Sequence, residues 1–225
     1  MKIFRYFSKF EWALWASSLF LIASFYCLFD RSSSLTLVAS LLGATSLIFC
    51  AKGNPFGQVL MILFSILYGI ISYSFAYYGE MITYLCMTGP MAIFALISWL
   101  RNPYNGNKSE VKVNRLKKAE IGFMMVLTLI VTAIFYFILK FFNTANLLPS
   151  TLSVTTSFIA VYLTFRRSPY FALAYAANDI VLIVLWVIAT IKDVSYISVV
   201  VCFFTFLVND LYGFVSWKKM ERRQG

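Results

Sequence analysis

Apolar residues along the chain form long runs that are separated by short polar or charged segments. A helix needs about 20 apolar residues to cross a hydrocarbon core of about 30 Å. Eight runs approach or exceed that length, at residues 12–29, 34–51, 56–78, 81–100, 119–141, 148–165, 170–191 and 195–217. The pattern therefore predicts an all-α polytopic membrane protein with eight transmembrane helices.

The longest polar segment lies near the middle of the chain and ends in a basic stretch. It divides the sequence into two parts of similar length, each with four predicted spans. We therefore predict a first four-helix unit at residues 1–100, a cytoplasmic basic linker at 101–118, and a second four-helix unit with a cytoplasmic tail at 119–225.

The two predicted units share a weak internal similarity. At an offset of 114 residues, Lys52 aligns with Arg166 and Pro55 aligns with Pro169. Because four spans is an even number, both units enter the membrane from the same side. The similarity therefore predicts two parallel repeats about an axis along the membrane normal, an arrangement that is typical of transporters.

The composition excludes a water-soluble globular domain. Hydrophobic residues make up 61% of the chain and charged residues only 12%, against about 25% charged residues in soluble domains. Lys and Arg outnumber Asp and Glu by 19 to 9, but the basic residues lie at the ends of the apolar runs, where lipid headgroups are. We therefore expect the lipid bilayer as a partner and no nucleic acid.

The basic residues also predict the orientation of the chain. With eight spans, the side that holds both termini carries 16 Lys and Arg, whereas the other side carries 3, namely Arg31, Lys140 and Lys192. The positive-inside rule then places both termini in the cytoplasm. The run at 12–29 exceeds a usual signal-peptide core and lacks a small-residue cleavage site, so we predict that it is the first span.

The residues that most often carry catalysis or hold metals are scarce. The chain has no histidine, and its four cysteines lie inside apolar runs without a CxxC spacing. We therefore predict no disulfide, no metal site, no cofactor and no catalytic residue.

Two Asn-Asp pairs lie inside predicted spans seven and eight, at residues 178–179 and 209–210. At 1.5 Å per residue, both pairs are roughly 12–14 Å from the cytoplasmic boundary. Ionisable groups at that depth are costly and indicate function by default. Polar and aromatic side chains at helical spacing suit a flat, polar ligand, and the predicted substrate-binding residues of this half are Tyr175, Asn178, Asp179, Trp186, Asn209 and Asp210.

The amides are our preferred ligand contacts, because an Asn side chain both donates and accepts hydrogen bonds. Asn178 and Asn209 are then expected to bind the substrate, with Trp186 or Tyr175 as the stacking surface. Asp179 and Asp210 would orient the helices and the amides. The alternative is that these polar groups satisfy one another as contacts between helices.

Polar residues of the first half could line the same cavity or pack helices, and the sequence leaves both open. The candidates on spans three and four are Gln58, Tyr68, Tyr84 and Thr88, with Glu80 on the same face as the last two. Gly89 and Pro90 form a Gly-Pro break inside span four. Because proline frees a backbone carbonyl, this break predicts a hinge.

Several of these segments resemble PnuC-type vitamin transporters. The similar segments are Asn54-Pro55-Phe56-Gly57-Gln58 and the stretches at 175–186 and 209–217. The family pattern has an aromatic residue four positions before an Asp, and a Gly four positions before a Trp. Here these are Tyr175 and Asp179, then Gly213 and Trp217, with Tyr175 standing where the family has Trp.

The resemblance implies a multi-pass transporter of the bacterial inner membrane. The implied fold is SWEET-like, with a 3+1+3 core and an extra N-terminal helix, and the implied assembly is a homotrimer. Members move unphosphorylated vitamin precursors by facilitated diffusion, mainly nicotinamide riboside, a precursor of NAD. A cytoplasmic kinase then traps the product by phosphorylation.

Other functions remain open at this point. Related branches of the family take thiamine, riboflavin or deoxynucleosides. A membrane-embedded enzyme would use Asp179 or Asp210 as acid and base, but it would do so without histidine or a metal constellation. A receptor or scaffold would not need duplicated helices. The chain has no Walker A pattern and no chain of carboxylates and histidines across the membrane, which favours passive transport.

Overall fold

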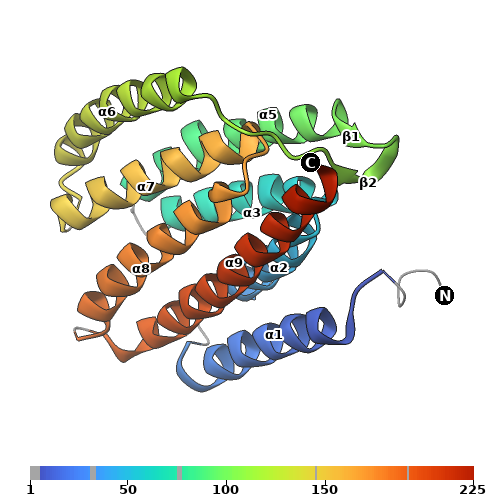
Figure 1. The fold of residues 1–225 in the computed structure, drawn as a ribbon. Coiled ribbons are helices and arrows are strands. Elements are labelled where there is room, and N and C mark those ends of the chain that lie inside the picture. Colours follow the sequence, from blue (N-terminus) through green and yellow to red (C-terminus); the bar gives the residue numbers. More distant parts are fainter. Residues whose placement is uncertain (1–5, 31–33, 75–77, 145, 192) are drawn as a thin grey trace.

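The helices of the protein form one bundle, which Figure 1 shows as a ribbon. A computed structural model describes residues 6–30, 34–74, 78–144, 146–191 and 193–225. Within these ranges, eight helical segments are long and apolar enough to cross a membrane. The predicted all-α membrane protein with eight spans is therefore confirmed.

The spans begin and end close to the predicted positions. The third helix is described as far as Ser74, and residues 75–77 of the predicted run lie outside the described residues. The last helix continues past 217 to Gln224. The helices are α1 (Lys9–Phe29), α2 (Ser34–Ala51), α3 (Phe56–Ser74), α4 (Tyr78–Ile82), the π-helix η2 (Thr83–Thr88), α5 (Gly89–Leu100), α6 (Lys118–Phe141), α7 (Leu147–Phe165), α8 (Tyr170–Thr190), the 3-10 helix η3 (Val194–Tyr196) and α9 (Ile197–Gln224).

Local sequence signals explain where several helices begin and end. Ser8 and Glu11 form a capping box at the start of α1, because each side chain bonds the backbone N–H of the other. Gly53 and Arg167 follow α2 and α7 with φ angles of 65° and 57°. These left-handed residues stop the two helices and turn the chain toward α3 and α8.

The polar linker contains a short hairpin that the sequence analysis did not predict. Strand β1 (Pro103–Tyr104) pairs antiparallel with β2 (Asn107–Val111). Asn105 and Gly106 connect them with φ angles of 48° and 77°. An Asn-Gly dipeptide adopts these positive angles readily, which is the physical reason for the turn.

The segments that the charge count assigned to the cytoplasm lie together at one end of the bundle. In Figure 1, the start of α1, the C-terminus, β1 and β2 lie at this end. The linker joins two interhelical loops there, because Val111 donates its backbone N–H to Gly53 and Asn114 donates to Arg167, both at 2.9 Å. Tyr6 donates its hydroxyl to the backbone oxygen of Ser109 at 3.2 Å.

Ion pairs strengthen the same end of the bundle. Their partners are Lys52 with Glu11, Arg115 with Glu221, Arg166 with Glu120, and Arg223 with Glu110. Four of the basic residues in the charge count, Lys2, Arg5, Arg31 and Lys192, lie outside the described residues. Which side of the membrane this end faces stays a prediction.

Equivalent helices of the two halves have equivalent neighbours. Helix α2 packs against α3 and α9, and α7 packs against α8 and α5. The Trp99 indole donates to the backbone oxygen of Thr164 at 2.9 Å, and the Trp217 indole donates to that of Cys50 at 2.8 Å. The two Trp rings contact each other, with centroids 5.3 Å apart. Two related units would produce this pattern, although the repeat and the domain division stay predictions.

Candidate functional site

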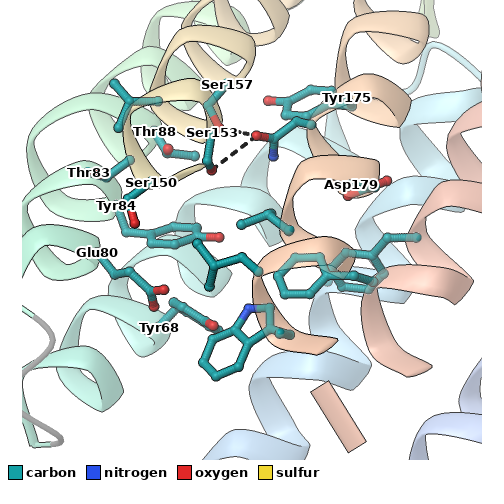
Figure 2. A pocket seen from close by; sticks show the side chains of 18 of the residues that line it. Tyr68, Glu80, Thr83, Tyr84, Thr88, Ser150, Ser153, Ser157, Tyr175 and Asp179 are labelled. Atoms are coloured by element: carbon teal, nitrogen blue, oxygen red, sulfur yellow. Dashed lines mark hydrogen bonds between the residues drawn. The ribbon is translucent and has the colours of Figure 1, made fainter. Parts of the chain in front are cut away.

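A cavity of about 90 Å³ lies inside the bundle, among α2, α3, the α4–η2 segment, α7, α8 and α9 (Figure 2). Its wall holds most of the predicted substrate-binding residues, namely Tyr68, Tyr84, Thr88, Tyr175, Asn178, Asp179, Trp186 and Asp210. The structure therefore brings residues from both halves of the chain to one place. Their contact with a substrate stays a prediction.

A second cavity of about 220 Å³ adjoins the first on the side away from the linker. The wall that both cavities share is mainly aromatic and consists of Phe64, Tyr68, Glu80, Trp186, Phe203 and Phe206. Small-molecule pockets in proteins begin at about 300 Å³. The two adjoining spaces together reach about that size.

Asn178 on α8 is held by three hydroxyl groups of α7. Its side-chain oxygen accepts hydrogen bonds from Thr156 at 2.8 Å, Ser157 at 3.1 Å and Ser153 at 3.3 Å. Figure 2 shows Ser153 and Ser157 with their hydrogen bonds at the cavity wall. Because its oxygen is fully occupied, Asn178 offers the cavity its amide N–H groups, which are donors.

Asp179 on α8 and Asp210 on α9 form a pair. Both residues are buried, with 4% of each exposed, and both line the cavity. One oxygen of Asp179 has no hydrogen-bond partner among the described residues. Whether the two carboxyl groups orient the helices or contact a ligand stays a prediction.

Aromatic rings form the wall opposite Asn178. The rings of Tyr68 on α3 and Tyr84 on η2 lie 4.5 Å apart, and Phe64 packs edge-on against Tyr84 at 5.8 Å. Trp186 packs against Tyr196 at 5.3 Å. These rings offer flat apolar faces to a ligand that can stack.

Two predicted substrate-binding residues lie away from the cavity. Asn209 donates its amide to Ser18 on α1 at 2.9 Å and to the backbone oxygen of Thr205 at 2.7 Å. Gln58 donates its amide to the Cys50 sulfur at 3.3 Å. Both are buried between helices, so the structure places them as contacts between α9 and α1 and between α3 and α2.

The predicted hinge at Gly89 and Pro90 follows directly after the π-helix η2. Gly89 donates its backbone N–H to Tyr84, five residues earlier, which is the hydrogen bond of a π-helix. Pro90 has no N–H to continue the regular pattern. The widened turn places Tyr84 and Thr88 on the cavity wall, while movement at this point stays a prediction.

Several polar cavity residues were left out of the predicted substrate-binding set, among them Glu80, Ser153 and Ser157. Glu80 lies on α4 and lines both cavities. The spacing of four residues between Glu80, Tyr84 and Thr88 placed all three on one helix face already in the sequence. Ser153 and Ser157 had no such signal.

Comparisons with known proteins agree with this architecture. A solved structure described as the crystal structure of the vitamin B3 transporter PnuC matches with a TM-score of 0.83 at 23% identity, over 97% of this chain and 94% of that chain. Among curated proteins, the nicotinamide riboside transporter PnuC of Neisseria mucosa is 25% identical over 99% of this chain and 86% of its own length.

The family model described as nicotinamide mononucleotide transporter matches residues 33–219, which is most of the chain. It includes every predicted site residue from Gln58 to Asp210. The resemblance to PnuC-type transporters that the sequence indicated is thereby confirmed, and this multi-pass membrane protein belongs to the nicotinamide mononucleotide transporter family.

Proposed function

We propose that this protein transports nicotinamide riboside across the membrane by facilitated diffusion. The observation that carries the proposal is the cavity itself, in which the amide donors of Asn178 face the rings of Tyr68, Tyr84 and Trp186. The donors suit the hydroxyl and carboxamide oxygens of the riboside, and the rings suit its flat base. The family membership and the named riboside transporter among the relatives support the same substrate.

The charge of the cavity favours the nucleoside over the nucleotide. Among the described residues, no Lys or Arg lines either cavity, whereas Glu80, Asp179 and Asp210 line the first. A phosphate group would therefore enter a low-dielectric space without a cation to neutralise it. We infer that the transported species is the unphosphorylated riboside and that phosphorylation by a cytoplasmic kinase would prevent its return.

The cellular setting follows the same proposal. We place both termini in the cytoplasm, because basic residues gather at the end of the bundle that holds the linker and tail. The bacterial inner membrane and the homotrimer are proposed from the family membership. We also propose that it is a transporter and not an enzyme. The family model and the named relatives, which are transporters, support this proposal.

Uptake into liposomes tests the proposal directly. Liposomes that contain the protein should fill with labelled nicotinamide riboside until the inside and outside concentrations are equal, and enclosed riboside kinase with ATP should increase the accumulated label. The recovered riboside should be chemically unchanged when no kinase is present. Uptake no faster than in protein-free liposomes would refute the proposal, and accumulation above equilibrium without kinase would refute facilitated diffusion.

Competition experiments distinguish the alternative substrates. An excess of unlabelled riboside should block uptake, whereas thiamine, riboflavin and a deoxynucleoside should block it weakly. A stronger block by one of these compounds would identify that compound as the substrate instead.

A further inference from the structure

Glu80 presents a carboxyl group to the cavity without a protein partner. Figure 2 shows its carboxyl group pointing into the cavity, beside the side chains of Tyr68 and Tyr84. Across the described ranges of the chain, Glu80 has no hydrogen bond or ion pair with another residue. An unpaired carboxylate within a membrane-spanning helix is costly, so its presence calls for a partner that arrives from outside the chain.

The other acidic residues around the cavities differ from Glu80 in their surroundings. Asp179 and Asp210 lie close to one another in the first cavity. At the second cavity, Asp193 accepts a hydrogen bond from the backbone N–H of Ser195 at 2.9 Å, and Asp30 is not without a partner either. Glu80 differs from them because it lies where the two cavities meet. A cation that moves from one cavity to the other would pass this carboxyl group.

The surroundings of Glu80 suit an organic cation. The rings of Tyr68 and Tyr84 pack 4.5 Å apart, and Trp186 lines the same two cavities as Glu80. Aromatic faces attract positive charge in addition to stacking on flat rings. Ser72 lines the second cavity with 1% of its surface exposed, and its hydroxyl has no hydrogen-bond partner among the described residues. This hydroxyl is a further polar group available to a ligand.

We propose that Glu80 is the counter-ion of a positively charged ligand and makes the site selective for a cationic nucleoside over a neutral one. The inference rests on the proposed function, since the pyridinium ring of nicotinamide riboside carries a permanent positive charge. In the bound state, the pyridinium ring lies against the aromatic wall and forms an ion pair with Glu80. The amide of Asn178 then bonds the uncharged part of the ligand.

The test compares two forms of one ligand. Reduction of nicotinamide riboside gives a dihydropyridine nucleoside of nearly the same shape without the positive charge. In titrations with purified full-length protein, the wild type should bind the charged form at least about tenfold more tightly than the reduced form. Equal affinity for the two forms in the wild type overturns the proposal, whatever the variants do.

Glu80→Gln removes the charge and keeps the size of the side chain. This variant should lose about tenfold or more in affinity for the charged form and little for the reduced form. Glu110→Gln, in the linker hairpin, is the matched control and should keep the wild-type preference. If Glu80→Gln weakens both forms equally or neither, Glu80 is not the counter-ion. A wild type that binds neither form would instead refute the proposed function.

Discussion

Replacing Asn178 by leucine should weaken riboside binding and loosen the contact between α7 and α8. The substitution keeps a side chain of similar size but removes both the amide donors that face the cavity and the oxygen that accepts from Ser153, Thr156 and Ser157. The two effects can be measured separately, because the first lowers the affinity for the ligand and the second lowers the stability of the ligand-free protein.

The structure allows both magnitudes to be worked out. When a hydrogen-bond acceptor of the ligand loses its donor, the free energy of binding weakens by about 1–3 kcal/mol, and the dissociation constant rises about 5- to 150-fold. Hydrogen bonds between membrane helices average about 0.6 kcal/mol, so the three bonds to Asn178 amount to about 2 kcal/mol of stability. Thr156 recovers part of this loss, since its hydroxyl can donate instead to the backbone oxygen of Leu152, 3.0 Å away.

Asn209→Leu is the control, because it removes the same chemical group at a matching depth but away from the cavity. It should weaken the contact of α9 with Ser18 on α1 and leave the affinity for riboside close to wild type. Isothermal titration in detergent measures the affinity, and thermal unfolding measures the stability. Equal losses of affinity in the two variants, with unchanged unfolding temperatures, would refute this assignment of the amides.

Three further predictions follow from the fold and the cavity. Trp99→Phe and Trp217→Phe should each lower stability in thermal unfolding by about 0.5–1.5 kcal/mol by removing one buried hydrogen bond, because the acceptor oxygens of Thr164 and Cys50 keep their backbone partners Arg167 and Gly53. The double variant should lose less than their sum because the rings touch. A reporter fused after Gly225 should be active in the cytoplasm, and labelling of a cysteine at Lys108 from outside the cell would contradict the topology. Nicotinamide mononucleotide should compete with labelled riboside at least about tenfold more weakly than unlabelled riboside does, and equal competition would contradict the charge argument.

The spans could be predicted from the sequence because the signal for each is local. Length and continuous apolarity alone decide whether a segment such as 119–141 can cross the bilayer. The hairpin between Pro103 and Val111 was not predicted, although its Asn-Gly turn is a local signal too. Its strands are short and mostly polar, so no hydrophobic pattern marks them in the sequence.

The sequence predicted the depth of the polar residues better than the direction of their side chains. Neighbouring residues on a helix point about 100° apart, so an Asn and the Asp after it contact different neighbours. In the structure, Asn178 bonds α7 and Asn209 bonds α1, while both Asp residues line the cavity. Which of these side chains reaches the cavity depends on how the helices are rotated in the bundle.

Depth also separates Gln58 from the residues that line the cavity. Tyr68 follows it by ten residues along α3, which corresponds to about 15 Å of helix. Gln58 therefore reaches the end of the bundle near the linker, where it bonds Cys50. Tyr84 and Thr88, one helical turn apart, were predicted on one face and do lie together on the wall.

The two halves of the chain contribute matching positions to the cavities but different chemistry. At the offset of 114 residues, cavity residues of α3 align with cavity residues of α8, and the aligned pairs are Met61 with Tyr175, Phe64 with Asn178, Tyr68 with Leu182, and Ser72 with Trp186. In each pair, the polar or aromatic character differs between the halves. The aromatic groups come from both helices, Tyr68 from α3 and Tyr175 and Trp186 from α8, whereas the amide comes only from α8 and the carboxyl group of Glu80 only from α4. Under the proposed function, this unequal distribution of amide and carboxyl groups would orient an asymmetric ligand such as a nucleoside.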